Sequence, residues 1–273
     1  MKARDKFWIF GVRPGQDDGW LHHSSPYSLY GSKMTPAEAA FYLNVPNMIM
    51  VNCQGIPVPF SHDAEKYMIS FTPCKKVLWS VDGSIGGRLG FEAEYVLDLS
   101  RRYPNLSGAF MDDFIGRYRE LPEPERTRRA AEFLRGVREQ LDQADRKLEL
   151  YVTYYTHEID PSHIELFKPI DGLTNWTWSC QDLDKLEENL ETLRNFMPDK
   201  KLLNGIYLFD FPTKQPVPLE LMELQCSTSL QLMKKGKLDG MIFETNSVMG
   251  VGSPNDAWTR EWIAQHGDEE VPD

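Results

Sequence analysis

Eight short apolar runs alternate with helix-like segments along the chain, and this alternation restricts the possible folds more than any other feature. The runs are rich in β-branched and aromatic residues, which is typical of strands buried on both faces of a parallel sheet. Eight such strands separated by helices predict a single (β/α)8 barrel with parallel strands, formed by residues 1–273 as one domain. The runs are FWIFGV (7–12), NMIMVN (47–52), KVLWSV (76–81), GAFMDD (108–113), LELYVTY (148–154), GLTNWTW (172–178), GIYLFDF (205–211) and LDGMIFE (238–244).

Helix signals between these runs support the same fold. Thr35-Pro36-Ala37-Glu38 combines an N-cap, a first-turn proline and the glutamate of a capping box. A doubly wound sheet is the alternative, but the first turn, VRPGQDDGW, lacks the GxGxxG pattern of that fold. Further predicted helices or helix starts are 123–147, Asp160-Pro161, Asp182, 216–236 after Pro218, Ser253-Pro254 and 255–266.

Composition and charge exclude several partners. A net charge of −11 argues against general binding to nucleic acid, and no apolar run of 18 residues predicts a membrane span. The four cysteines lack metal-ligand spacing and predict reduced thiols in a cytoplasmic protein. His22 and His23 with Asp17 or Asp18 are an alternative metal site, but adjacent loop histidines favour a polar surface. We therefore expect neither a metal nor a cofactor, and the oligomeric state stays open.

The active site of such a barrel forms where the strands end, at their carboxyl side. In this sequence, carboxylates follow the third, fourth, seventh and eighth strands, and aromatic residues follow the fifth, sixth and seventh. This mixture suits a carbohydrate or glycoconjugate, because aromatic faces stack on sugar C–H groups while carboxylates and amides bind hydroxyls. The predicted substrate-binding residues are Arg13, Asp82, Tyr154, Asn175, Trp176, Trp178, Tyr207, Asp210 and Asn246.

The fourth strand ends in two adjacent aspartates, Asp112 and Asp113, within LSGAFMDDFIG. Cleavage of a glycosidic bond needs a proton donor, and a neighbouring carboxylate and apolar surroundings both raise a carboxyl pKa into the useful range. We predict Asp113 as general acid/base, Asp112 as its polarising partner or stabiliser, and Glu244 as a further catalytic carboxylate. Structural alternatives are an ion pair of the aspartates with Arg117 and one of Glu244 with Arg13.

Three motifs carry a resemblance to a known family. AFMDDF (109–114) resembles the paired aspartates of the O-GlcNAc-hydrolase type of β-N-acetylglucosaminidase, glycoside hydrolase family 84. NWTW (175–178) is similar to the Trp-Thr segment of that family, and YLFDFPT (207–213) to its Asp-Asn-Tyr-Pro segment. The resemblance implies a (β/α)8 barrel and substrate-assisted hydrolysis. Asp112 would then polarise the 2-acetamido group, and Asp113 would be the general acid/base.

The resemblance covers about a tenth of the chain, and two features depart from it. Phe211 stands where the family pattern has asparagine, and no aspartate follows shortly after Pro212. The substrate-assisted mechanism and a mechanism with two carboxylates both remain open at this point.

Two other functions compete with the glycoside hydrolase. One is a barrel enzyme acting on a phosphorylated or carboxylated small sugar, as an isomerase, aldolase or lyase. MGVGS (249–253) supports it, because it precedes a predicted helix where barrels often bind phosphate. The other is a non-catalytic sugar-binding barrel, which would keep the aromatic residues without turnover.

Overall fold

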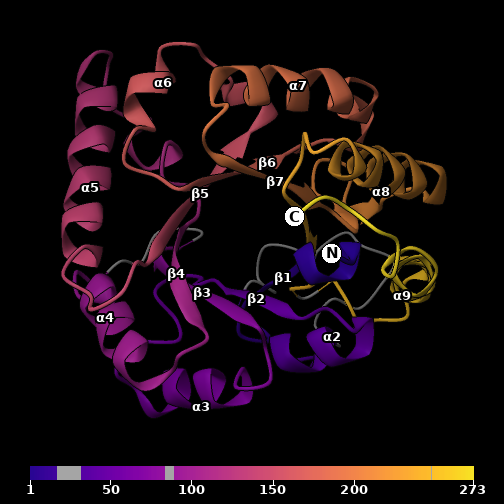
Figure 1. Cartoon of the computed structure of the whole chain (residues 1–273), viewed down its shortest axis with the longest axis horizontal. Helices are drawn as coiled ribbons and strands as arrows, with labels where there is room; N and C mark the ends of the chain where they lie inside the picture. The colour runs from indigo at the N-terminus through magenta and orange to yellow at the C-terminus, as the bar shows by residue number, and fades with distance from the viewer. Residues whose placement is uncertain (17–31, 84–88, 247) are drawn as a thin grey trace.

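The computed structural model describes residues 1–16, 32–83, 89–246 and 248–273. Eight parallel strands close into a barrel in the order β1-β10-β7-β6-β5-β4-β3-β2, and Figure 1 shows helices α2 to α9 in a ring around it. The predicted fold is therefore confirmed. The strands are β1 Phe7–Gly11, β2 Asn47–Met50, β3 Lys76–Asp82, β4 Leu106–Met111, β5 Glu149–Tyr155, β6 Gly172–Trp176, β7 Lys201–Ile206 and β10 Gly240–Glu244.

The helices connect successive strands and begin largely where the capping signals lie. Thr35 forms the predicted capping box with Glu38, and Ser253 caps α9 with Pro254 in its first turn. The helices are α2 Pro36–Leu43, α3 His62–Ser70, α4 Glu92–Arg102, α5 Glu125–Leu141, α6 His163–Leu166, α7 Leu186–Phe196, α8 Leu219–Lys234 and α9 Pro254–His266. Short 3-10 turns are η1 Ala3–Lys6, η3 Gly116–Tyr118, η4 Thr156–Glu158 and η5 Cys180–Lys185.

Three predicted helix boundaries differ from the structure. The helix predicted for 123–147 is α5, which ends at Leu141. Asp160 does not start a helix; its carboxylate accepts a hydrogen bond from the Ser162 backbone N–H, and α6 begins after Ser162. Asp182 is not an N-cap either, because Ser179 takes that position ahead of η5.

The seventh strand begins four residues before its predicted position. A buried polar residue, Asn204, interrupts the apolar pattern of β7 and conceals the start of the strand. Its amide accepts a hydrogen bond from Asn175 at 2.9 Å and donates one to Ser229 at 3.0 Å. The aromatic residues beyond β7 instead lead into a small antiparallel hairpin of β8 (Phe209–Asp210) and β9 (Gln215–Pro216).

Alternating side chains of the strands divide the apolar core into two parts. One cluster fills the barrel interior and includes Trp8, Phe10, Phe110, Tyr151 and Trp176. The other lies between the strands and the surrounding helices. This alternation decides which strand-end residues point into the barrel mouth and which point toward the helices.

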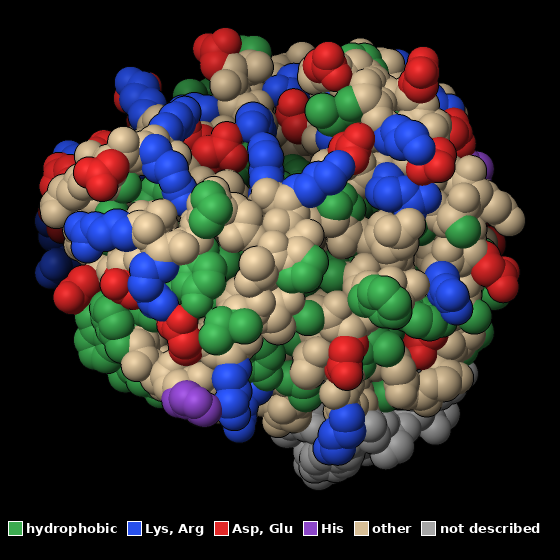
Figure 2. Space-filling model, turned by 60° about the horizontal axis from the view of Figure 1, so that its bottom comes forward, with side chains coloured by type: hydrophobic (Ala, Val, Ile, Leu, Met, Phe, Trp, Pro, Cys, Tyr) green, Lys and Arg blue, Asp and Glu red, His purple; other side chains and the backbone are tan. Residues whose placement is uncertain are grey.

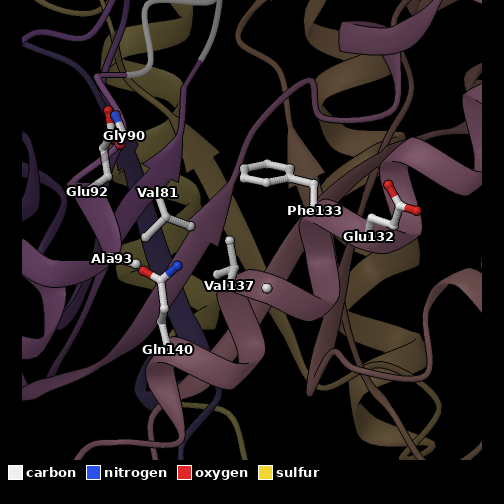
Figure 3. Close-up of a pocket in the computed structure, with 9 residues that line it drawn as sticks. Val81, Gly90, Glu92, Ala93, Glu132, Phe133, Val137 and Gln140 are labelled. Atoms are coloured by element: carbon white, nitrogen blue, oxygen red, sulfur yellow. Dashed lines mark hydrogen bonds between the residues drawn. The ribbon is translucent and has the colours of Figure 1, made fainter.

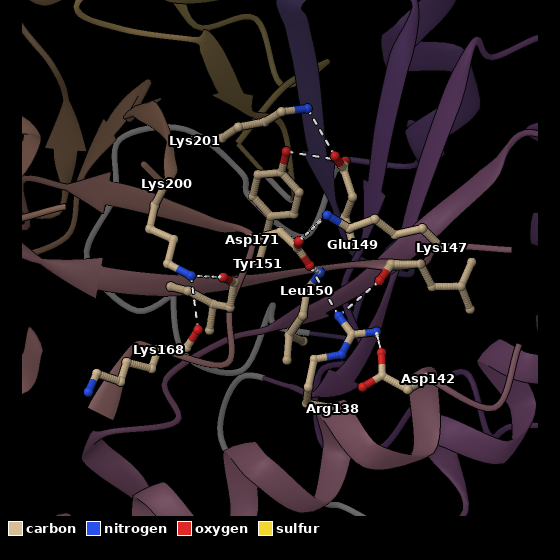
Figure 4. A network of polar contacts seen from close by, with 12 residues as sticks. Arg138, Asp142, Lys147, Glu149, Leu150, Tyr151, Lys168, Asp171, Lys200 and Lys201 are labelled. Atoms are coloured by element: carbon tan, nitrogen blue, oxygen red, sulfur yellow. Dashed lines mark hydrogen bonds and ion pairs between the residues drawn. The ribbon is translucent and has the colours of Figure 1, made fainter. Parts of the chain in front are cut away.

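The amino-terminal end of the barrel is closed by paired charges. Asp171, just before β6, accepts from Arg138 at 3.1 Å, from Lys147 at 2.6 Å and from the Leu150 backbone N–H at 3.0 Å (Figure 4). Glu149 accepts from Lys201 at 2.9 Å and from the Tyr151 hydroxyl at 3.3 Å. The two chain ends also meet here and appear over the middle of the ring in Figure 1.

On the side formed by α2, α3 and α4, basic and acidic side chains lie between small apolar patches (Figure 2). Phe41 and Ile69 are exposed on α2 and α3, and isolated apolar residues of this kind are normal on a protein surface. No helix in the described part of the chain is long and apolar enough to cross a membrane. Within the same residues, no group of three His, Cys, Asp or Glu side chains could hold a metal ion.

Candidate active site

A pocket of about 760 Å³ opens at the carboxyl ends of β3 to β6, and we call it the mouth pocket. It combines acidic, basic and aromatic side chains, as expected for a site that binds a polar ligand with apolar faces. Its lining consists of Gly83, Asp113, Gly116, Arg117, Arg119, Glu120, Tyr155, His157, Glu158 and Trp178. Gly83 is required there, because a Cβ at this position would lie 1.5 Å from the Asn52 carbonyl oxygen.

The two adjacent aspartates have different environments. Asp113 is partly exposed in the mouth pocket and accepts a hydrogen bond from the Tyr155 hydroxyl at 2.8 Å. Asp112 is only 5% exposed and accepts from the Thr153 hydroxyl at 2.9 Å. Burial, followed by the charge of Asp113, raises the pKa of Asp112 well above its usual range. One aspartate therefore faces the pocket, and the other lies behind it.

The backbone of Asp113 is in the left-handed region, with φ of 51°. This conformation costs about 1 kcal/mol for a residue with a side chain, although aspartate tolerates it better than most residues. It ends β4 sharply and allows the second of two consecutive aspartates to turn into the pocket. The Asp113 carbonyl also accepts from the Arg117 backbone N–H at 3.2 Å, which links the turn to η3.

Glu158 is a third carboxyl of this region that the sequence analysis missed. It lies in η4, directly after β5, and lines the mouth pocket together with Asp113. Its carboxylate accepts from the Tyr155 backbone N–H at 3.2 Å. Burial raises the pKa of Glu158 to about 7, and the charge of Asp113 contributes in the same direction. No sequence pattern marks this residue, because its burial arises from the way the β5 end folds back over the barrel.

Tyr155, rather than Tyr154, reaches the barrel mouth. Tyr155 has the same orientation as Tyr151 and Thr153, whereas the Tyr154 hydroxyl points to the helix layer, where it donates to the Glu158 carbonyl at 2.7 Å and contacts His163 at 2.9 Å. The prediction that Tyr154 lies at the rim is therefore corrected. In this run, Leu150 and Val152 alternate with Glu149 and Thr153. The period of a strand therefore assigns Tyr154 to the apolar face and Tyr155 to the face of Thr153, which is the arrangement observed.

Three predicted aromatic residues lie together near the mouth. Trp178 lines the pocket, its ring stacked on Phe211 at 5.0 Å and edge-on to Tyr155 at 6.0 Å. Tyr207 packs 4.8 Å from Trp176, which is 2% exposed and fills the barrel interior. Burial, followed by the charge of Glu244, raises the pKa of Tyr207 well above its usual range. Trp178 thus lines the pocket, and Tyr207 connects it to the barrel interior, since its ring also lies edge-on to Trp178 at 6.2 Å.

Two of the predicted ion-pair alternatives have other partners in the structure. Arg117 binds the buried carboxylate of Asp82, with Nε at 2.8 Å, and not the Asp112–Asp113 pair. Arg13 pairs with Asp63 of α3 at 2.9 Å, with its side chain 44% exposed, and not with Glu244. Glu244 itself is 2% exposed at the end of β10, near Tyr207. Asp82 therefore acts on the pocket by holding Arg117, which lines it.

Two other predicted substrate-binding residues have structural partners away from the mouth. Asn175 is completely buried and donates to Asn204, so it points toward the helix layer, and its predicted rim position is corrected. Asp210 accepts from the Cys180 backbone N–H at 2.7 Å and the Thr213 backbone N–H at 3.0 Å, which fixes the β8–β9 hairpin. Asp210 lies in the hairpin rather than at the end of a barrel strand, because β7 already ends at Ile206.

Asn246 follows β10 and is partly buried. The loop residues Asp17, Asp18, His22 and His23 lie outside the described residues.

The loop 249–253, considered as a phosphate site, already binds an internal anion. The carboxylate of Asp256, in the first turn of α9, accepts from the Gly250 backbone N–H at 2.9 Å. Burial raises the pKa of Asp256, whereas backbone hydrogen bonds from Gly250, Gly252 and Val251 oppose that shift. An incoming phosphate would have to displace this carboxylate, so the geometry gives little support to a phosphosugar enzyme.

A second pocket, of about 310 Å³, lies between α4 and α5. Figure 3 shows Phe133 and Val137 of α5 on one side of it, with Val81 and Ala93 on the other. Of the two acidic residues that line it, Glu92 accepts from the Gly90 backbone N–H at 2.9 Å and so fixes the start of α4, and the other is Glu132 of α5. This pocket has the character of a gap between helices, in contrast to the mouth pocket.

No protein-family model matches the chain, and the search of curated proteins found no match. Among solved structures, the chain is similar to the GH51 arabinofuranosidase from Xanthomonas axonopodis pv. citri, with a TM-score of 0.60 and 12% identity over 98% of this chain and 74% of that chain. It is also similar to the GH99 endo-alpha-mannosidase from Bacteroides thetaiotaomicron, with a TM-score of 0.59 and 10% identity over 96% of this chain and 97% of that chain. Active domain 2 of a thermostable chitinase from Pyrococcus furiosus has a TM-score of 0.52 and 14% identity over 96% of this chain and 94% of that chain.

At these identities the likeness establishes the (β/α)8 barrel and leaves the chemistry to be argued from the site.

Proposed function

We propose that the protein is a glycoside hydrolase whose reaction takes place in the mouth pocket, with Asp113 as a catalytic carboxyl. The observation that carries this proposal is the position of Asp113, which is partly exposed in a 760 Å³ pocket and hydrogen-bonded to Tyr155. Similarity in fold to several glycoside hydrolases supports the same class. The substrate is a small carbohydrate or glycoconjugate.

The remaining residues of the pocket suit this chemistry. Trp178 provides an accessible aromatic face for a sugar ring, and Arg117, oriented by Asp82, provides N–H donors for its oxygens. Asp112 places a second carboxyl behind Asp113, where burial favours its neutral form. The Tyr155 hydroxyl stabilises the ionised form of Asp113 by donating to it.

A finer version follows the resemblance to glycoside hydrolase family 84. In it, Asp112 polarises a 2-acetamido group of the substrate, and this group attacks the anomeric carbon while Asp113 acts as general acid/base. This version requires the acetamido group to reach Asp112, which is 5% exposed. A preference for 2-acetamido sugars distinguishes it from a mechanism in which two carboxyls act on the glycosidic bond and on water.

The test compares the wild type with Asp113→Asn on aryl glycosides, including aryl 2-acetamido sugars, with analysis of the product anomer. We expect Asp113→Asn to lower kcat/KM by about 10²–10⁴-fold, because proton transfer by a positioned carboxyl contributes about that much. Turnover of 2-acetamido sugars alone would favour the substrate-assisted version. Wild-type protein that binds a sugar but hydrolyses none of the glycosides would contradict the proposal and favour a non-catalytic sugar-binding barrel.

A further inference from the structure

The mouth pocket contains a second partly buried carboxyl that faces the same space as Asp113. Glu158 reaches it from η4, after β5, whereas Asp113 reaches it from the end of β4. Tyr155 holds both groups, since its hydroxyl donates to Asp113 at 2.8 Å and its backbone N–H donates to Glu158 at 3.2 Å. A single rigid strand end therefore fixes the relative positions of two carboxyls from different segments.

These two carboxyls receive different hydrogen bonds. The Tyr155 hydroxyl donates to Asp113, and the Tyr155 backbone N–H donates to Glu158. For Glu158, burial outweighs the effect of this hydrogen bond on the pKa. Burial, with the nearby charge of Asp113, raises the pKa of Glu158 to about 7, so that it keeps its proton far above the usual range of a glutamate. Neighbouring carboxyls whose environments push their pKa values apart are the usual arrangement of an acid and a base.

We propose that Glu158 is the proton donor of the hydrolysis and that Asp113 is the carboxylate that activates water. This inference rests on the proposed function and divides its acid/base work between two residues. The Glu158 carboxylic acid gives its proton to the glycosidic oxygen while the bond from that oxygen to the anomeric carbon breaks, with the electron pair staying on the oxygen. Asp113 takes a proton from water, and the water oxygen bonds to the anomeric carbon. The products are an alcohol and a free sugar, and proton exchange with solvent restores both carboxyls.

Other charged or titratable groups line the same pocket and act on this pair. Arg117, Arg119 and Glu120 approach from the η3 side, and His157 stacks on Tyr155 with the ring centroids 5.4 Å apart. Arg117 is bound to Asp82, and Arg119 lies 3.5 Å from Glu120. The positive charges of the two arginines therefore have acidic partners of their own.

The test uses aryl glycosides that differ in how much their leaving group needs protonation. For Glu158→Gln we expect kcat/KM to fall by about 10²–10⁴-fold on a poor leaving group such as 4-methylphenol. On a 2,4-dinitrophenyl glycoside, whose leaving group departs without a proton, we expect a loss of less than about tenfold. Wild-type activity on the 4-methylphenyl glycoside should decline above about pH 7, where Glu158 loses its proton. This decline should be absent with the 2,4-dinitrophenyl glycoside. Glu165→Gln on α6, a surface residue paired with Lys168 at 2.6 Å, is the matched control.

An equal loss on both substrates would show that Glu158 has a structural role and would overturn the inference. Full activity of Glu158→Gln on both substrates would also overturn the inference. If Asp113→Asn were inactive in that case, the proposed function would still hold. Absence of turnover by the wild type would overturn both proposals together. Glu158→Asp is a second variant that controls for misfolding. Its shorter carboxyl should still donate a proton to the 4-methylphenol leaving group in part, and the variant should still unfold cooperatively on heating.

Discussion

The carboxyl groups at the two ends of the barrel have different partners. At the amino-terminal end, Asp171 contacts two cations and a backbone N–H, and Glu149 contacts Lys201 (Figure 4). At the carboxyl end, Asp112, Asp113 and Glu158 receive hydrogen bonds from Thr153 and Tyr155 instead. The first arrangement gives each carboxylate a basic partner, and the second raises the pKa of two of its three members.

This difference separates stability from function within one fold. A carboxylate with a basic partner contributes to the folded state, whereas carboxyls held close together reduce stability at neutral pH. Barrels generally place their chemistry at the carboxyl ends of the strands and keep the opposite end for structure. Removing a carboxylate should therefore lower the free energy of unfolding at the amino-terminal end and raise it at the carboxyl end, and three predictions test this comparison.

The largest expected effect on stability is at Asp171. Its side chain is 18% exposed, and Arg138, its main partner, is 16% exposed. Asp171→Ala leaves the guanidinium of Arg138 with a reduced set of acceptors in a largely buried place, and we expect a loss of about 3 kcal/mol in the free energy of unfolding. Urea denaturation measures this loss. Unchanged kcat/KM of the folded variant is also expected, and a large drop in kcat/KM would contradict the separation of the two ends.

A smaller and opposite effect is expected at Glu158. Its pKa is raised from 4.5 to about 7 in the folded protein, so folding favours the protonated form, and stability falls as pH rises from about 4.5 to about 7. Glu158→Gln removes this titration. The variant should match the wild type near pH 4. At pH 8 it should exceed the wild type by about 2 kcal/mol, which is less than the roughly 3.4 kcal/mol that the full shift represents, because Glu158 is partly exposed and solvent weakens the effect.

Urea denaturation across this pH range measures the difference. The gain should shrink in an Asp113→Asn background, because the charge of Asp113 is one cause of the shift. A gain that is independent of pH would indicate a packing effect of glutamine and would count against the raised pKa.

The fold could be predicted from sequence because buried parallel strands leave near-continuous apolar runs. In β5 the side-chain orientation could be predicted as well, since Leu150 and Val152 alternate with Glu149 and Thr153. This alternation places Tyr155, and not Tyr154, on the inward face. Asn204 had the reverse effect, because a polar residue that bonds to Asn175 and Ser229 makes a buried strand look like a loop. Alternation is informative only where one face of a strand is polar.

The candidate site was predicted where charge stands out against an apolar background. Asp112 and Asp113 follow a buried strand, so their position at the barrel mouth could be inferred, and the structure places Asp113 in the pocket. Glu158 could not be found in this way, because it lies in a polar turn, THEID (156–160), where a glutamate is ordinary. Its raised pKa depends on burial and on Asp113, which is distant in sequence and becomes a neighbour only after folding.

The smallest expected effect is at Lys147, the exposed member of the Asp171 cluster. Its side chain is 72% exposed, although its ammonium group lies 2.6 Å from the Asp171 carboxylate. Solvent and salt screen such a contact, so Lys147→Ala should lower the free energy of unfolding by about 0.5 kcal/mol at low salt and by less at about 1 M salt. Urea denaturation at both salt concentrations measures this. If Lys147→Ala cost as much as Asp171→Ala, the amino-terminal end would owe its stability to the charge pair itself rather than to the burial of Arg138 and Asp171.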